Sequence, residues 1–434
     1  MASFMMGGHE MHEINSEEKA QFQLERLQST LNRAYKNVLF HQNRQNIDGI
    51  SGGIERFRVE SIEDLATFPF MERKHLGNNY PYGLFAVPLK DIVRIHTAPG
   101  TTVNPTVSGY TRQDLQLWRE MVSTALAASN VSVSDILQIN LDPGLANWGR
   151  DYKDGAETIG ASVIPNTSLS LEKQLMVLKD YKTSVLITTP SSISQLADYI
   201  LLKENLDPKD LNLKTLILTG EPVDSEFRNL LQQNFHLTTW LHYGLSEVPG
   251  PAIAFECREH EGLHVNENHF LPEIVDPETG QPLPEGETGE LILTTLTTRA
   301  FPLIRFKTGD RARFIKGTCK CRSPFVRIEW FNDRIDNMLN ISGVKVNQEL
   351  VLFQIEQALG FVPANCCFLK KRNGARNYLE VSLSVDDRLF SDEIKVLERL
   401  MKTVGNKLQE HIGVPVTIRL KEKKSFENRA GLVV

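Results

Sequence analysis

The chain has 434 residues, with 48 Lys and Arg against 54 Asp and Glu, which gives a formal net charge of −6 at pH 7. This length allows two or three domains around a large buried core, and the acidic balance argues against a nucleic-acid partner, which requires a basic surface. The five cysteines do not make a disulfide framework in a chain of this size and favour a reducing compartment.

Two further features narrow the class of protein. No apolar run reaches the ~20 residues that a membrane helix needs. The first dozen residues have neither the basic start nor the apolar core of a secretion signal. We therefore expect a cytoplasmic protein that acts on small molecules and has no membrane partner.

The first half of the chain predicts helices that alternate with strands. Residues 16–38 carry apolar side chains at helical spacing, which predicts an amphipathic helix. Further on, helical segments alternate with short apolar runs, a pattern typical of a mainly parallel sheet covered by helices. These segments are residues 115–129, 135–142, 170–181, 184–190, 193–204 and 215–221. In such sheets ligands bind at the carboxyl ends of the strands.

The pattern changes after residue 263. Turn motifs at 276–280 and 284–289 separate short strands, which predicts an antiparallel subdomain. Residues 338–420 predict one strand-helix-strand-helix-strand unit. We therefore predict an α/β fold with a large domain of residues 1–333 and a small α+β domain of residues 334–434.

One segment, residues 303–347, predicts a nucleotide site. It places Asp310 on a loop after a strand, and Arg334 and Asp336 near the predicted domain boundary. A ribose offers two adjacent hydroxyls that a carboxylate can accept together, and a guanidinium can hold ribose or phosphate oxygens.

Several long segments resemble the phenylacetate–coenzyme A ligase family, a branch of the AMP-forming adenylate enzymes. The likeness covers nearly the whole chain, through residues 23–40, 61–70, 78–96, 105–115, 242–251, 294–310 and the region of Arg334. The resemblance implies an adenylate-forming fold whose small C-terminal domain is mobile. It also implies that ATP and Mg²⁺ activate a small carboxylic acid as its acyl-adenylate, with AMP as a product, and that the acyl group passes to coenzyme A or a carrier-protein thiol. The sequence does not determine the oligomeric state, and a homodimer is one expectation.

The resemblance also implies roles for individual residues. In Tyr243-Gly-Leu-Ser-Glu247, the tyrosine would lie by the adenine, Ser246 would meet the α-phosphate and Glu247 would hold magnesium. The backbone around Gly220, Glu221 and Pro222 would line the adenine. The alternative for residues 243–247 is a turn of packing residues, and the alternative for Gly220, Glu221 and Pro222 is an ordinary turn.

Three further roles come from the same resemblance. Asp310 would bind the ribose hydroxyls, with Arg334 beside it. Asp336 would be the hinge at which the small domain rotates between an adenylating and a thioester-forming arrangement. A surface salt bridge is the alternative reading of Arg334 and Asp336.

Two stretches depart from the family pattern. The phosphate loop retains Gly100, Thr101 and Thr102, whose N–H groups and hydroxyls could cradle phosphate, but Val103-Asn104 replaces its Gly-Lys pair. Near the C-terminus, Arg429 stands where the family has a catalytic lysine, and arginine is bulkier and planar. These losses support a second hypothesis, in which adenylation is impaired and the protein acts as an acyltransferase or a non-catalytic partner.

The acyl pocket also differs. Where the family has a glycine-rich strand and loop, residues 145–155 read LANWGRDYKDG. Trp148 could stack on an aromatic acid, and a solvated loop is the alternative.

A metal site is suggested by three cysteines and a histidine. Cys319 and Cys321 share one loop, and Cys257 lies upstream with His264 or His260. Four such ligands would form a closed, tetrahedral and therefore structural Zn²⁺ site, and reduced thiols without metal are the alternative. The adjacent Cys366 and Cys367 are expected to pack in a strand.

Overall fold

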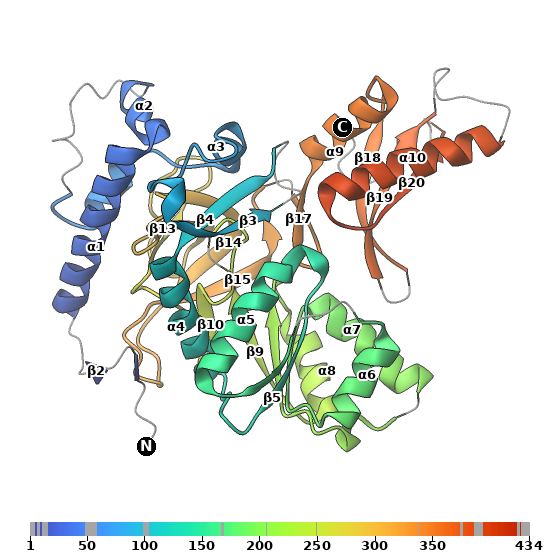
Figure 1. Ribbon diagram of the computed structural model, residues 1–434, viewed down its shortest axis with the longest axis horizontal. Helices are drawn as coiled ribbons and strands as arrows, with labels where there is room; N and C mark the ends of the chain where they lie inside the picture. The colour runs from blue at the N-terminus through green and yellow to red at the C-terminus, as the bar shows by residue number, and fades with distance from the viewer. Residues whose placement is uncertain are drawn as a thin grey trace.

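The computed structural model describes residues 5–6, 9–10, 16–47, 59–98, 104–165, 169–204, 206–248, 250–336, 338–373, 376–385, 394–422 and 426. Its largest unit is an 11-stranded sheet in the order β12-β13-β14-β15-β11-β10-β9-β8-β7-β5-β6. Figure 1 shows helix α1 on one side of this sheet and a separate C-terminal unit on the other.

The parallel half of the sheet matches the predicted alternation. Its strands are almost continuously apolar because helices cover them. Helices α6, α7 and α8 are each preceded by an N-cap residue whose side chain accepts a backbone N–H group, and these residues are Ser170, Thr189 and Asp224. The strands are β5 (Ile136–Asn140), β6 (Ser162–Ile164), β7 (Val185–Thr188), β8 (Thr215–Thr219) and β9 (Thr238–Tyr243). The helices are α4 (Arg112–Ala128), α5 (Ala146–Ile159), α6 (Leu171–Asp180), α7 (Pro190–Asp198, followed by a π-helical turn, Tyr199–Lys203) and α8 (Ser225–Phe235).

The antiparallel strands continue the same sheet. The sequence predicted a subdomain, but β10 pairs with both β9 and β11, so the two halves share one hydrogen-bonded ladder. These strands are β10 (Ala254–Glu256), β11 (Leu263–Val265), β12 (Phe270–Val275), β13 (Thr288–Thr295), β14 (Phe306–Ile315) and β15 (Arg327–Arg334).

The N-terminal segments pack around this sheet. The predicted helix at 16–38 is α1 (Ser16–Asn37), whose buried face includes Leu27 and Leu31. The other elements of this region are β1 (Met5–Met6), β2 (His9–Glu10), α2 (Leu39–Ile47), α3 (Arg73–Asn78), β3 (Ile92–Ala98) and β4 (Thr106–Thr111).

The alternative of a solvated loop at residues 145–155 is wrong, because residues 146–155 lie in α5 and Leu145 directly precedes this helix. Leu145, Trp148, Tyr152 and Ala156 recur at helical spacing and are buried in one hydrophobic cluster. Gly160 ends the helix in the left-handed conformation, with φ +91°. Trp148 is 4% exposed and packs within that cluster.

The C-terminal unit, whose described residues lie between 338 and 422, has its own hydrophobic cluster. The unit contains two strands more than the sequence predicted, because both its first strand and its middle strand are hairpins. Cys366 and Cys367 are buried in β18, as expected. The elements are β16 (Met338–Ile341), β17 (Val344–Asn347), α9 (Gln348–Leu359), β18 (Cys366–Asn373), β19 (Arg376–Ser384), α10 (Ile394–Ile412) and β20 (Val416–Lys421).

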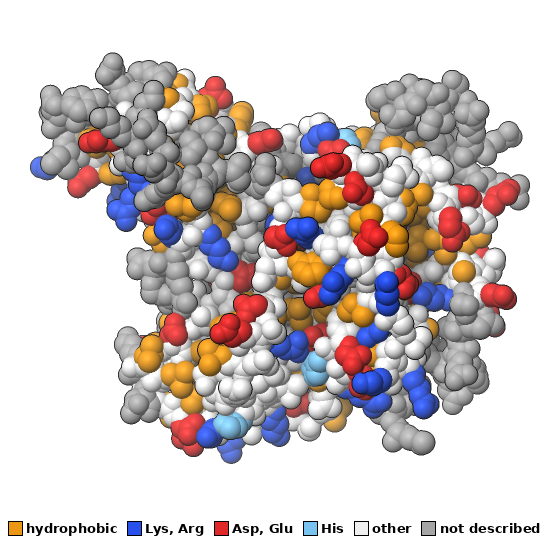
Figure 2. Space-filling model, turned by 180° about the vertical axis from the view of Figure 1, so that it is seen from behind, with side chains coloured by type: hydrophobic (Ala, Val, Ile, Leu, Met, Phe, Trp, Pro, Cys, Tyr) orange, Lys and Arg blue, Asp and Glu red, His pale blue; other side chains and the backbone are white. Residues whose placement is uncertain are grey.

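Two surface properties complete the description. On the face drawn in Figure 2, basic and acidic side chains are intermixed. Within the described part of the chain, no helix combines the length and apolar composition of a membrane span.

Acid is expected to destabilise the protein through His242 on β9. Its Nε2 lies 2.9 Å from Ser129 Oγ and its Nδ1 lies 3.0 Å from Tyr152 Oη. Ser129 Oγ donates its proton to the Ala125 carbonyl, so the neutral ring donates from Nε2 and accepts at Nδ1. Burial lowers the pKa of His242 from 6.5 to about 3. The unfolded chain therefore binds the proton more tightly, and the stabilisation present above pH 6.5 is lost as the pH falls towards 3.

At pH 4 this single group should remove about 3 kcal/mol of the free energy of unfolding. Urea titrations at pH 7 and pH 4 measure the loss, and His242→Gln, which retains a donor and an acceptor, is the comparison. The variant should be less sensitive to acid than the natural protein. Equal sensitivity would contradict the assignment.

Candidate active site

Asp310 lies within β14 and not on a loop after a strand, and it faces Arg334 because of a local distortion in β14. The two residues are paired across β14 and β15, and the register shifts between Asp310 and Ala312, as at a β-bulge. Gly309 precedes the shift with φ +72°, and a Cβ at this position would collide with the Asp336 carboxylate. Only glycine can adopt this positive φ and leave room for Asp336 without strain. The glycine in Thr308-Gly-Asp310 therefore allows the Asp310 carboxylate to lie directly against Arg334.

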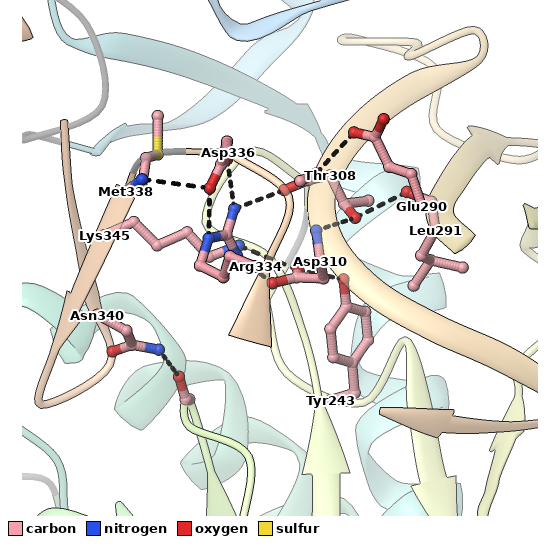
Figure 3. A network of polar contacts seen from close by, with 12 residues as sticks. Tyr243, Glu290, Leu291, Thr308, Asp310, Arg334, Asp336, Met338, Asn340 and Lys345 are labelled. Atoms are coloured by element: carbon pink, nitrogen blue, oxygen red, sulfur yellow. Dashed lines mark hydrogen bonds and ion pairs between the residues drawn. The ribbon is translucent and has the colours of Figure 1, made fainter. Parts of the chain in front are cut away.

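The Asp310 carboxylate is the centre of a buried polar network (Figure 3). Arg334 donates to Oδ1, Tyr243 Oη donates to Oδ2 at 2.8 Å, and Lys345 Nζ lies 3.3 Å from Oδ2. Burial by itself would raise the pKa of Asp310, but Arg334, Lys345 and Arg73 together outweigh burial and hold this pKa below its ordinary value. Asp310 is therefore an anionic acceptor in a water-poor setting.

Asp336 lies in the connection between β15 and β16 and is held from two sides. Arg334 donates from Nε and Nη2 to its two carboxylate oxygens, each at 2.6 Å, and Arg73 Nη1 donates to Oδ2 at 3.0 Å. Arg334 is 9% exposed and also pairs with the buried Asp310, which excludes the surface alternative for Arg334, whereas Asp336 is 26% exposed.

Glu247 follows β9 and is fully buried. Its Oε1 accepts from Arg73 Nε at 2.7 Å, and the same guanidinium donates from Nη2 to the Thr308 carbonyl at 2.6 Å. Burial by itself would raise the pKa of Glu247, but Arg73 and Lys345 hold it below its ordinary value. Its Oε2 has no hydrogen-bond partner among the described residues. A buried, ionised oxygen without a partner fits a hard cation such as Mg²⁺.

A third element of the site is the turn at the carboxyl end of β8. Gly220 has φ +81°, and its carbonyl accepts from Asn340 Nδ2 at 3.0 Å. Glu221 Oε2 accepts from the Ser191 backbone N–H and hydroxyl, and Glu221 Oε1 lies 3.6 Å from Lys370 Nζ. Pro222 follows and is half-buried. The C-terminal unit therefore contacts this turn through Asn340 and Lys370.

Several other predicted site residues are not joined to this network by the structure. Ser246 is half-buried beside Glu247. Gly100, Thr101, Thr102 and Arg429 lie outside the described residues.

Sequence reasoning missed Arg73 and Lys345. Arg73 lies 174 residues from Glu247 and 263 from Asp336, and no local motif points to it. The sequence around Lys345 could have indicated a functional residue, because Lys345 is a charged residue between two apolar ones, Val344 and Val346. A charged residue in an apolar strand often faces a ligand or a partner.

The predicted metal ligands converge. One ligand atom from each of Cys257, His264, Cys319 and Cys321 lies within 4.8 Å of all the others. The distance from Cys257 Sγ to Cys319 Sγ is 3.6 Å, near the ~3.8 Å between two sulfur ligands of a tetrahedral zinc ion. The distance from Cys321 Sγ to His264 Nε2 is 3.4 Å, near the ~3.5 Å between a sulfur and a nitrogen ligand.

The geometry also decides which histidine belongs to this cluster. His264 Nδ1 lies 3.2 Å from the Phe325 carbonyl, an arrangement that fixes the ring proton on Nδ1 and leaves Nε2 free to bind a metal. His260 instead contacts Glu256 and Arg228. The cluster joins the loop after β10, strand β11 and the connection between β14 and β15.

Comparisons with known proteins agree with this geometry. A family model described as AMP-binding enzyme matches residues 158–297. Phenylacetate-coenzyme A ligase of Thermus thermophilus is 34% identical over 432 residues, covering 96% of this chain and 95% of the relative. The enzyme of the same name from Pseudomonas putida is 39% identical and covers 75% of this chain and 73% of the relative.

Solved structures show the same fold. 2-Hydroxyisobutyryl-CoA ligase with 2-HIB-AMP and CoA in the thioesterification state aligns with a TM-score of 0.85 at 20% identity, covering 96% of this chain and 89% of that chain. The same ligase with 2-HIB-AMP in the postadenylation state aligns with a TM-score of 0.68 at 20% identity, covering 96% of this chain and 88% of that chain.

The fold and the site define an adenylate-forming AMP-binding enzyme. Identity of 34% that extends over 96% of the chain narrows this class further. The chain belongs to the phenylacetate–coenzyme A ligase family of AMP-forming ligases, which confirms the family predicted from the sequence.

Proposed function

We propose that this ligase activates an aryl carboxylic acid as the acyl-adenylate and transfers the acyl group to coenzyme A. The observation that supports this most strongly is the pairing of a buried, anionic Asp310 with Arg334 close to Glu247 and its unpartnered oxygen. A sugar acceptor within β14 and a cation ligand just after β9 suit a nucleotide that carries a metal-bound phosphate.

In the adenylation step, Asp310 would accept the ribose hydroxyls. A carboxylate has about four lone-pair sites, and Arg334, Tyr243 and Lys345 already contact this one. Accepting both hydroxyls would therefore require Asp310 to give up one of these three contacts. Arg334 would keep Asp310 ionised, and the Gly220 turn would border the adenine. Mg²⁺ held by Glu247 would offset the phosphate charge during attack by the acid. Ser246 and the loop of Gly100, Thr101 and Thr102 would contact phosphate, and Arg429 would carry the charge of the family lysine.

The aryl group would lie against the start of α5. Leu145, the residue before this helix, packs against Gly220 and Gly343, so the helix begins at the edge of the nucleotide site. Trp148, one turn further, would then form part of an aromatic wall.

The arrangement of the two parts of the chain supports an assignment to the thioester-forming state. The C-terminal unit contacts the nucleotide site through Asn340, Lys345 and Lys370. The higher TM-score belongs to the relative that was solved in its thioesterification state. We assign Asp336 as the pivot between this arrangement and the adenylating one.

ATP–pyrophosphate exchange tests the proposal. Phenylacetate, benzoate and 4-hydroxyphenylacetate should support exchange, acetate should support little, and coenzyme A should then yield the aryl thioester. The same assay decides the alternative that adenylation is impaired. Absence of exchange with every acid, by a protein that still binds AMP, would favour that alternative and contradict the proposal.

We also propose a structural Zn²⁺ bound by Cys257, His264, Cys319 and Cys321. The convergence of their ligand atoms and the orientation of His264 support it. A carrier-protein thiol as acceptor, a homodimer and a cytoplasmic location remain predictions from the sequence.

A further inference from the structure

The hairpin of β3 and β4 buries polar side chains beside the candidate active site. His96 is opposite Ser108 in its ladder, and Thr106 lies two residues before Ser108, so these three side chains share one face. All three are buried. Ser108 Oγ donates to the backbone carbonyl of Glu247 at 3.2 Å. His96 therefore lies next to the segment that carries the proposed metal ligand.

Three buried polar atoms of this region have no hydrogen-bond partner among the described residues. They are His96 Nε2, Thr106 Oγ1 and Glu247 Oε2. Buried polar atoms are nearly always paired in folded proteins, so three such atoms at neighbouring positions indicate a polar ligand that completes them. Glu247 Oε2 is already assigned to Mg²⁺, which leaves the ring nitrogen and the hydroxyl for other parts of the ligand.

The same face of β3 also contacts the helix of the proposed acyl pocket. Arg94, two residues before His96, donates from Nη1 to Asp151 at 3.1 Å and from Nη2 to Asp154 at 3.3 Å. Both carboxylates lie on α5, within two turns of Trp148. His96 is thus between the helix assigned to the aryl group and the segment assigned to the metal-bound phosphate. The carboxylate of the acid joins these two groups during the reaction.

His96 is a neutral group with a fixed position. Burial, together with the charges of Arg94 and Arg150, lowers the pKa of His96 from 6.5 to about 4. Its ring packs against Tyr110, with 4.7 Å between the ring centroids. A neutral imidazole has one N–H donor. A donor that is already held in place can stabilise charge on a reacting oxygen without reorganising.

We propose that His96 is a catalytic residue that donates a hydrogen bond from Nε2 to the oxygen of the acid that becomes the acyl carbonyl oxygen. This inference rests on the proposed function. In adenylation the other carboxylate oxygen forms a bond to the α-phosphorus, and the bond from phosphorus to pyrophosphate breaks, with its electron pair leaving on pyrophosphate. The oxygen bound by His96 loses charge in this step, so the contact there orients the acid.

In thioester formation the same oxygen gains charge. The coenzyme A sulfur forms a bond to the carbonyl carbon, the thiol proton passes to water, and the carbonyl π electron pair moves onto the oxygen. This pair then reforms the carbonyl as the bond from carbon to the phosphate oxygen breaks, and AMP leaves with the electrons of that bond. His96 stabilises the oxygen when it is most negative. Its removal should therefore affect acyl transfer more than adenylation.

Measuring the two half-reactions separately tests the assignment. With synthetic phenylacetyl-adenylate and coenzyme A, His96→Leu should slow acyl transfer by about 10²- to 10³-fold. In ATP–pyrophosphate exchange the same variant should raise KM for phenylacetate about tenfold and leave KM for ATP within a few-fold. His96→Gln, whose amide N–H can lie near the position of Nε2, should recover part of the transfer rate. His96→Asn, whose shorter amide lies nearer Nδ1, should not.

Tyr110→Phe is the matched control, because it alters packing on the same face of the hairpin and keeps the ring of His96. Both half-reactions should stay within a few-fold of the natural rates. Transfer by His96→Leu at the natural rate would overturn the assignment. A rise in KM for ATP as large as that for phenylacetate would also overturn it, since this indicates a general distortion of the hairpin.

The comparison of His96→Gln with His96→Asn does not depend on the folding of His96→Leu. If the glutamine variant transfers no faster than the asparagine variant, the assignment also fails. A natural protein that performs neither half-reaction would instead contradict the proposed function itself.

Discussion

Replacing Glu247 by glutamine is expected to slow ATP–pyrophosphate exchange by about 10²- to 10³-fold. Glutamine keeps the shape of the side chain but lacks the negative charge of the oxygen that we assign to Mg²⁺. Because Arg73 can still donate to a neutral oxygen, the fold around α3 should persist. The variant should also need more Mg²⁺ for half-maximal exchange than the natural protein.

Glu256→Gln provides the matched comparison. Glu256 is also buried and pairs with an arginine, Arg228, but it lies on β10 and its contacts are outside the network of Asp310. Its replacement should lower stability and leave the exchange rate per folded molecule intact. Exchange by the Glu247→Gln protein at the natural rate and Mg²⁺ dependence would remove Glu247 from the proposed metal site.

Loss of zinc should have the second large effect, on stability. The natural protein should contain one zinc per chain by elemental analysis, and Cys319→Ser should contain none. Structural zinc sites supply folding free energy directly, and the loss of several kcal/mol should lower the thermal midpoint by on the order of 10 °C. Scanning calorimetry with and without a chelator measures the difference.

Cys367→Ser separates metal binding from thiol packing. Cys367 is as buried as Cys319 but lies in β18, away from the cluster. This variant should retain its zinc and lose no chelator-sensitive stability. A natural protein that contains no zinc and is indifferent to chelators would establish the alternative of reduced thiols.

The part of the site that the sequence could predict lies in contiguous motifs. Asp310 and Arg334 were both expected at a nucleotide, and the pairing of β14 with β15 brings them together. The family resemblance supplied most of this expectation. Local patterns alone did not reveal the β-bulge, which depends on the positive φ at Gly309 and on the neighbouring strand.

Contacts between distant segments could not be predicted in this way. Arg73 meets Glu247 and Asp336 only because α3 packs against β14, and one sequence contains no record of that packing. His264 and His260 were equivalent by spacing. The register of β10 and β11 and the neighbouring Phe325 carbonyl distinguish the two histidines.

The error at residues 145–155 had a different origin. Leu145, Trp148, Tyr152 and Ala156 follow a 3.6-residue period, which predicts a helix. Comparison with a glycine-rich family segment suggested a loop instead. The helical period predicted the conformation correctly, because burial of one apolar face favours a helix at these residues.

Arg73 has a consequence for how the enzyme can move. Its single guanidinium touches Glu247, Asp336 and the Thr308 carbonyl. If the chain turns at Asp336, one of these three attachments breaks and the electrostatic surroundings of Glu247 change with it. The affinity of the site for Mg²⁺ and the orientation of the C-terminal unit are then coupled. Mg²⁺ shifts the balance between the two orientations by the same factor by which the orientation changes the affinity for Mg²⁺.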